Sequence, residues 1–368
     1  MEKPTRPVAR RLGGAIALAV LAVVLAPDPA AAHGVGGIKP TNYETVITGM
    51  EPAVPGLIVR SVDLGDRLEL TNHTGRDVVV LGYDDEPYLR VGPRGVFENT
   101  RSPATYVNRT LRGTTPVPDR ADPEAPPEWR RIGDEPVARW HDHRSHWTAR
   151  RDAPAVRSDP DHRHVVQRFG IELRDGRRLV AVTGEIRWVP ATSAWLWLAL
   201  AFVLAAFVVA VSRTTVARLG LSVALVVVIA AQSLHVVGSW GATTLGIGTR
   251  LGASVYALGA IGVSVVALVW LWRRGVHTAA PLVLLAGLFV AIAGGLADVT
   301  VLTRSQLPTT LDDDLARGIV AAALGLGVGL AVAGALRLRP DRRARGRQPA
   351  DDASWPSTQS WHSSSSVA

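Results

Sequence analysis

Residues 219–240 read LGLSVALVVVIAAQSLHVVGSW, a stretch without a single Asp, Glu, Lys or Arg. A helix of that length rises about 33 Å, which is enough to cross the hydrocarbon core of a bilayer. Four more apolar runs of similar length accompany it, at 191–212, 251–272, 279–302 and 315–336. The sequence therefore predicts an all-α bundle of five transmembrane helices over residues 191–336.

The overall composition agrees with a membrane protein. Hydrophobic residues make up 47% of the 368 residues, and the 20% that are charged are segregated between the apolar runs. This pattern excludes a soluble single-domain enzyme and a disordered chain. The chain has no cysteine, which excludes disulfides, iron–sulfur clusters, thiolate metal sites and cysteine nucleophiles.

The charges between the apolar runs predict the orientation in the membrane. If residues 33–190 are exported, the segments on the inner side hold ten arginines, at 213, 218, 273, 274, 337, 339, 342, 343, 345 and 347. The segments on the outer side hold three, at 250, 304 and 317. This asymmetry follows the positive-inside rule and predicts a multi-pass protein of the cytoplasmic membrane with its C-terminus inside. The lipid bilayer is thus the expected partner, and nucleic acid is not.

The N-terminal residues 1–32 have the features of a secretory signal peptide. A basic start precedes a short apolar segment, and Ala30 and Ala32 occupy the −3 and −1 positions of a cleavage site. Cleavage after Ala32 makes His33 the first mature residue. Its α-amine and imidazole can then chelate one metal ion together, a nitrogen set that suits Cu(II).

Residues 33–190 contain short strand-like runs instead of membrane-spanning ones. Arg67–Thr71 alternates polar and apolar residues, and Asp175-Gly176 separates two runs as a hairpin turn would. The expected strands are 57–62, 67–71, 77–82, 88–91, 137–141, 165–173 and 179–189. Their number and spacing predict an all-β extracytoplasmic sandwich, immunoglobulin-like or cupredoxin-like. The proline-rich segment 114–136 is expected to be a long surface loop.

Histidines are concentrated in this domain, which holds seven of the ten. The segment Trp140–Trp147 reads WHDHRSHW. If the strand continues through it, His141 and His143 point to the same face, and His146 returns to them through a turn. Together with His33 they form a candidate copper site, with zinc as the second choice. The competing interpretation is that this segment is structural, and the sequence leaves both open.

Two ionisable residues fall inside the predicted spans, His235 in the second and Asp298 in the fourth. Both lie near the outer ends of their helices, so we expect them to meet, with Gln232 one helical turn before His235 on the same face. Polar groups at such depth are costly and usually face a partner or a cavity. The pair is either a structural hydrogen-bonded contact or part of a proton or metal relay.

Two resemblances to known proteins accompany these features. The Ala32–His33–Gly34 junction resembles the mature start of CopC-type periplasmic copper proteins, which implies copper binding. Most of residues 33–190 resembles a group of uncharacterised actinobacterial membrane proteins with a secreted N-terminal domain, and this resemblance implies no established activity. It rests on Asn42–Thr45, Pro55–Leu57, Leu68–Asn72, Val80–Tyr83, Glu86–Arg90, Ser102–Tyr106 and Trp140–Trp147.

Taken together, the residues predict a membrane protein whose exported domain binds or handles a metal ion, copper first. The alternative is a non-catalytic envelope scaffold that docks a protein partner through the proline-rich loop. The sequence has no G-x-S-x-G, H-E-x-x-H or P-loop motif and therefore singles out no catalytic residue. Residues 337–368 are expected to form a basic, Ser-rich cytoplasmic tail.

Overall fold

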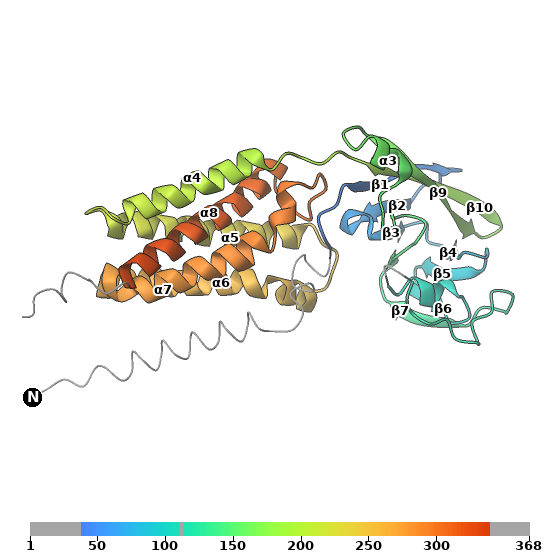
Figure 1. Ribbon diagram of the computed structural model, residues 1–368. Coiled ribbons are helices and arrows are strands. Elements are labelled where there is room, and N and C mark those ends of the chain that lie inside the picture. Colours follow the sequence, from blue (N-terminus) through green and yellow to red (C-terminus); the bar gives the residue numbers. More distant parts are fainter. Residues whose placement is uncertain (1–37, 111–112, 339–368) are drawn as a thin grey trace, which may run out of the picture.

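The computed structural model describes residues 38–110 and 113–338. An antiparallel β-rich region comes first along the chain, and a bundle of helices follows it (Figure 1). The predicted signal peptide, His33 and most of the predicted tail lie outside the described residues.

The larger β-sheet has seven antiparallel strands in the order β1-β10-β9-β4-β5-β6-β7. The long β9–β10 hairpin turns at Gly176, whose φ of +63° lies in the left-handed region that glycine adopts without strain. This is the hairpin that Asp175-Gly176 predicts. The strands are β1 (Tyr43–Glu51), β4 (Val78–Leu81), β5 (Pro87–Gly92), β6 (Gly95–Asn99), β7 (Trp129–Gly133), β9 (His164–Asp175) and β10 (Arg178–Trp188).

The smaller sheet has three antiparallel strands in the order β2-β3-β8. These are β2 (Leu57–Val62), β3 (Arg67–Asn72) and β8 (Val137–Trp140), and short helical turns η3 (Asp63–Gly65), α2 (Ala104–Val107) and α3 (Pro154–Ser158) lie in the connections. Leu68 and Leu70 of β3 are fully buried in one apolar cluster with Ile171 and Leu173 of β9. One core therefore joins the two sheets.

All seven predicted strands form, but the prediction for 114–136 is wrong in part. Residues Trp129–Gly133 pair with β6 as the edge strand β7 instead of belonging to a loop. Three consecutive positions of β7 are exposed, so the strand lacks the alternating pattern that marks a half-buried strand. Strands β1 and β6 were not predicted either.

Four helical segments are long and apolar enough to cross a membrane in the described part of the chain. They are α5 (Ala217–Gly241), α6 (Ile247–Arg274), the segment Val276–Leu296 and α8 (Asp313–Leu338). The third consists of α7 (Val276–Phe289) continued by the π-helix η4 (Val290–Leu296), and the short 3-10 helix η5 (Val299–Leu302) follows it. The first predicted span forms the 17-residue helix α4 (Trp195–Val211), which is shorter than the other four.

Small residues let α8 pack closely against its neighbours in the bundle. A side chain at Gly325 would collide with the backbone of Ala201 in α4, and one at Gly287 of α7 would collide with the backbone of Ala331. Close approach of this kind is how helices associate where water provides no driving force. The Gly325–Gly329 motif therefore serves packing within the bundle.

The two ends of the bundle differ in character. One end touches the β domain, where the Thr41 and Gln306 backbones exchange hydrogen bonds of 3.0 and 2.8 Å. At the opposite end, Arg218 lies over the ring of Trp272, and the Arg337 guanidinium donates to the Ser212 carbonyl. Basic and aromatic side chains thus gather at the end remote from the β domain.

Candidate functional site

The histidine-rich segment after β8 is built around a buried carboxylate. Asp142 is fully buried, accepts a 3.1 Å hydrogen bond from Trp140 Nε1, and pairs with the Arg144 guanidinium at 2.9 Å. Arg144 in turn lies over the Tyr83 ring, 4.8 Å from its centroid. This network fixes the path of the segment between the two sheets.

The strand does not continue through the histidines, because β8 ends at Trp140 and the residues after it form turns. The expectation that His141 and His143 share one strand face therefore fails. His141 Nδ1 lies 2.6 Å from the carbonyl oxygen of Asp66, and His143 Nε2 lies 3.1 Å from that of Thr110. The His143 and His146 rings meet edge to face, with centroids 5.5 Å apart.

The environment of His141 favours its neutral form. Burial lowers the pKa of His141, and the nearby Arg67, His146 and His143 act in the same direction, while the bond to the Asp66 carbonyl opposes them. Because its pKa is lowered, His141 is neutral at pH 7. Neutral imidazole is the form that ligates a metal ion.

The donor set of a metal centre is incomplete in the described residues. Nowhere in residues 38–110 and 113–338 do three or more His, Asp or Glu side chains come together to hold a metal ion. His143 and His146 supply two neighbouring imidazoles, whereas His33 lies outside this range. Two imidazoles fit part of a copper or zinc site, which takes four ligands in its usual forms.

A second His-x-His pair, at 162 and 164, forms hydrogen bonds with Asp159, a few residues earlier in the same loop. His162 Nδ1 lies 2.6 Å from Asp159 Oδ1, and His164 Nε2 lies 2.6 Å from the Asp159 carbonyl oxygen. The hydrogen bond to the Asp159 carboxylate raises the pKa of His162. This pair therefore stabilises the loop before β9.

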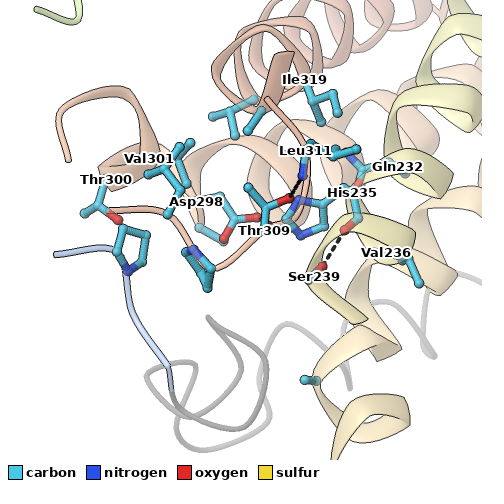
Figure 2. Close-up of a pocket in the computed structure, with 18 of the residues that line it drawn as sticks. Gln232, His235, Val236, Ser239, Asp298, Thr300, Val301, Thr309, Leu311 and Ile319 are labelled. Atoms are coloured by element: carbon cyan, nitrogen blue, oxygen red, sulfur yellow. Dashed lines mark hydrogen bonds and ion pairs between the residues drawn. The ribbon is translucent and has the colours of Figure 1, made fainter. Parts of the chain in front are cut away.

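A cavity of about 360 Å³ lies at the end of the bundle that faces the β domain. Helices α5, α6 and α8, the η4–η5 region and the segment just before β1 contribute to its wall. Within it, His235 Nε2 lies 3.6 Å from Asp298 Oδ2. Figure 2 shows these two side chains facing each other, with Gln232 one turn along α5.

Asp298 lies beyond the helix that was expected to contain it. The fourth span was predicted as 279–302, but its helix ends at Leu296, and Asp298 precedes the 3-10 turn η5. The last turns of this helix form the π-helix η4, in which Gly294 and Gly295 leave room for Gln232 of α5 and Leu324 of α8. The carboxylate therefore lies just past the end of this helix, beside His235 of α5.

The sequence did not point to Lys39 and Arg304 in this cavity or to Asp63 at the nearby contact with the β domain. Lys39 and Arg304 both line the cavity, although nothing in their sequence surroundings connects them. Asp63 holds the junction together, since its carboxylate accepts hydrogen bonds of 2.9 and 2.7 Å from the backbone N–H and hydroxyl of Thr244. Such contacts across 181 residues carry no local sequence signal.

Comparison of the chain with protein-family models, with curated proteins and with solved structures gave no match. The fold itself defines the class: this is a multi-pass membrane protein with an N-terminal antiparallel β-sheet region.

Proposed function

We propose that the protein is a multi-pass protein of the cytoplasmic membrane whose β domain, outside the cell membrane, binds a metal ion. Copper is the first choice and zinc the second. The observation that carries it is the His143–His146 pair, whose rings meet edge to face with centroids 5.5 Å apart. A domain with these neighbouring imidazoles and a mature N-terminal His33 has enough nitrogen donors for Cu(II).

The hydrogen bonds of the histidines support this proposal. A metal-binding imidazole usually donates its second ring N–H to a carbonyl or carboxylate, which fixes the tautomer and the ring orientation. The Thr110 carbonyl can accept this hydrogen bond from His143 Nε2, and the Asp66 carbonyl can accept it from His141 Nδ1. Each ring then keeps its other nitrogen as a lone-pair donor.

The orientation we propose rests on the basic end of the bundle. Arg218, Arg274 and Arg337 all lie at the helix ends remote from the β domain, on the side that the positive-inside rule assigns to the cytoplasm. We infer that α4 is a fifth span, because Phe202 and Phe207 on it are 75% and 61% exposed, as lipid-facing side chains are. The β domain, a sandwich of immunoglobulin-like or cupredoxin-like type, then lies outside.

Copper titration of the full-length protein in detergent tests the metal site. His143→Ala and His146→Ala should each weaken Cu(II) binding about tenfold or more, while the exposed His162→Ala serves as the matched control. Binding should also weaken as the pH falls through about 6.5, because protons compete for the imidazole nitrogens. Equal copper affinity in all four proteins would contradict the proposal and favour the envelope scaffold.

The contribution of His33 needs a separate comparison. Inserting one Ala between Ala32 and His33 moves the free amine away from the imidazole, and N-terminal sequencing shows whether cleavage occurred at the expected bond. We expect weaker Cu(II) binding by the extended form. An unchanged affinity would remove His33 from the site.

A further inference from the structure

The cavity between the β domain and the bundle contains a buried acceptor without a donor. Gln232 is 1% exposed, and its Oε1 has no hydrogen-bond partner in the described part of the chain. Gln232 lies against Gly294 of the π-helix η4, where a Cβ would clash with the amide group. A buried amide oxygen without a partner destabilises the folded protein, so a site that keeps one is expected to receive a donor from elsewhere.

Two hydroxyl groups that line the cavity already donate to backbone carbonyls. The Ser239 hydroxyl donates to the His235 carbonyl, and the Ser254 hydroxyl donates to the Arg250 carbonyl at 2.9 Å. Asp298 adds a carboxylate beside His235. The deep part of the cavity therefore offers an amide oxygen and a carboxylate to a ligand that carries N–H donors.

The part of the cavity nearer the β domain has the opposite charge. Lys39 and Arg304 line it, and neither forms an ion pair within the described residues. Both lie next to the Thr41–Gln306 contact that joins the β domain to the bundle. Gln232 lies three residues before His235 in α5, which runs towards the β domain, so the acceptors lie deeper than the two cations.

We propose that this cavity binds a small zwitterion, a ligand with a primary ammonium group and a phosphate or carboxylate. Its ammonium donates to Gln232 Oε1 and the Asp298 carboxylate, and its anionic group faces Lys39 and Arg304. The volume of about 360 Å³ accommodates such a molecule. A bare metal ion fits less well, because the cavity has no set of three His, Asp or Glu ligands among the described residues.

Thermal unfolding of the full-length protein in detergent tests the proposal with phosphoethanolamine as the probe. A ligand that binds only the folded state raises the unfolding midpoint. Phosphoethanolamine should therefore raise it, whereas phosphocholine, whose quaternary nitrogen has no N–H, should have at least tenfold lower affinity. Equal affinities for the two would overturn the proposal.

Substitutions in the cavity test whether phosphoethanolamine binds there. Gln232→Leu removes the acceptor without leaving an unpaired polar group and should weaken phosphoethanolamine binding at least tenfold, as should Asp298→Asn. Gln232→Glu keeps an acceptor and should retain binding, and Ser233→Ala, on the exposed face of the same helix, is the matched control. Equal binding by Gln232→Leu and the control would overturn the proposal.

The same chemistry occurs in a soluble molecule and in the phosphatidylethanolamine headgroup, and nanodiscs separate the two sources. If the ligand is the lipid, the protein melts higher in phosphatidylethanolamine discs than in phosphatidylcholine discs, and free phosphoethanolamine adds nothing in the former. If it is soluble, the two discs give the same midpoint and free phosphoethanolamine raises both. No response to a primary amine in either disc overturns the proposal.

Discussion

Asp142 shows how one buried charge can organise a segment that otherwise resembles a ligand set. Its carboxylate takes hydrogen bonds from Trp140 Nε1 and from the guanidinium of Arg144, while the histidine rings bind backbone carbonyls. Asp142 and Arg144 pair with each other, and the Arg144 guanidinium lies over the ring of Tyr83.

Replacing this carboxylate gives the prediction at the scale of the residue. Asp142→Asn removes the charge that compensates Arg144, and breaking a buried pair by removing one partner costs about 3–5 kcal/mol. We expect the full-length variant to unfold at a clearly lower midpoint temperature than the unsubstituted protein, as measured by tryptophan fluorescence. The control is Asp161→Asn, at an exposed position of the same domain. Equal midpoints in the two variants would show that the pair contributes little.

At the scale of the elements, a strand could be predicted where apolar, buried side chains alternate with polar ones along it. Strand β3 reads RLELTN and buries Leu68 and Leu70, so alternation reveals it. Edge strand β7 reads WRRIG with its middle three residues exposed, and β1 has only partly buried and exposed positions. β1 packs Tyr43, Ile47 and Met50 against the core, and both strands pair with a neighbouring strand through backbone hydrogen bonds. Backbone pairing leaves no periodic pattern in the sequence.

Helix α8 provides the prediction at the scale of the element. A Cβ at Gly325 would collide with the backbone of Ala201 in α4, which cannot move aside as a flexible side chain can. Gly325→Ala should therefore destabilise the bundle by about 1–3 kcal/mol, the usual cost of overpacking. The measurement is the thermal midpoint in detergent.

The matched control lies two turns earlier in the same helix. A Cβ at Gly318 would sit at an ordinary 3.7 Å from the Trp197 ring. Gly318→Ala should leave the midpoint unchanged or raise it slightly, since Ala is the better helix former by about 1 kcal/mol. If both variants behave alike, α4 does not depend on close approach to α8.

The whole molecule is held together at the contact between the β domain and the bundle. Asp63 and Leu64 adopt left-handed φ values of 53° and 56°, which are uncommon for residues other than glycine. This turn directs the Asp63 carboxylate to Thr244 in the loop between α5 and α6. A strained backbone conformation of this kind persists only where the surrounding contacts hold it in place.

Thr244→Val tests this contact at the scale of the molecule. The variant keeps the backbone N–H but removes the hydroxyl that donates to the buried Asp63 carboxylate. A hydrogen bond to a charged group contributes about 1.5–3 kcal/mol. We therefore expect amide hydrogen exchange near 63–65 and 241–246 to become about tenfold faster or more.

The control for this experiment is Thr214→Val, at the opposite end of the bundle, where the hydroxyl bonds only to its own turn. That variant should leave exchange at the junction unchanged. Unaltered exchange in Thr244→Val would mean that the Thr41–Gln306 backbone pair alone holds the two regions together.

The sequence by itself determined that the chain has a β-rich region and apolar helices, because periodicity and hydrophobic length are local properties. Four of the five expected spans are long and apolar enough in the structure, and α4 is shorter. The sequence also drew attention to His235, Asp298 and Gln232 as polar groups in apolar surroundings.

Only the tertiary structure decided what surrounds those groups. Lys39, Gln232 and Arg304 come from segments far apart in the chain, and they line one cavity because the β domain contacts one end of the bundle. Likewise, the end of β8 at Trp140 separates His141 from the strand face on which it was predicted. Contacts of this kind depend on long-range packing and hydrogen bonding, which no local pattern of residues encodes.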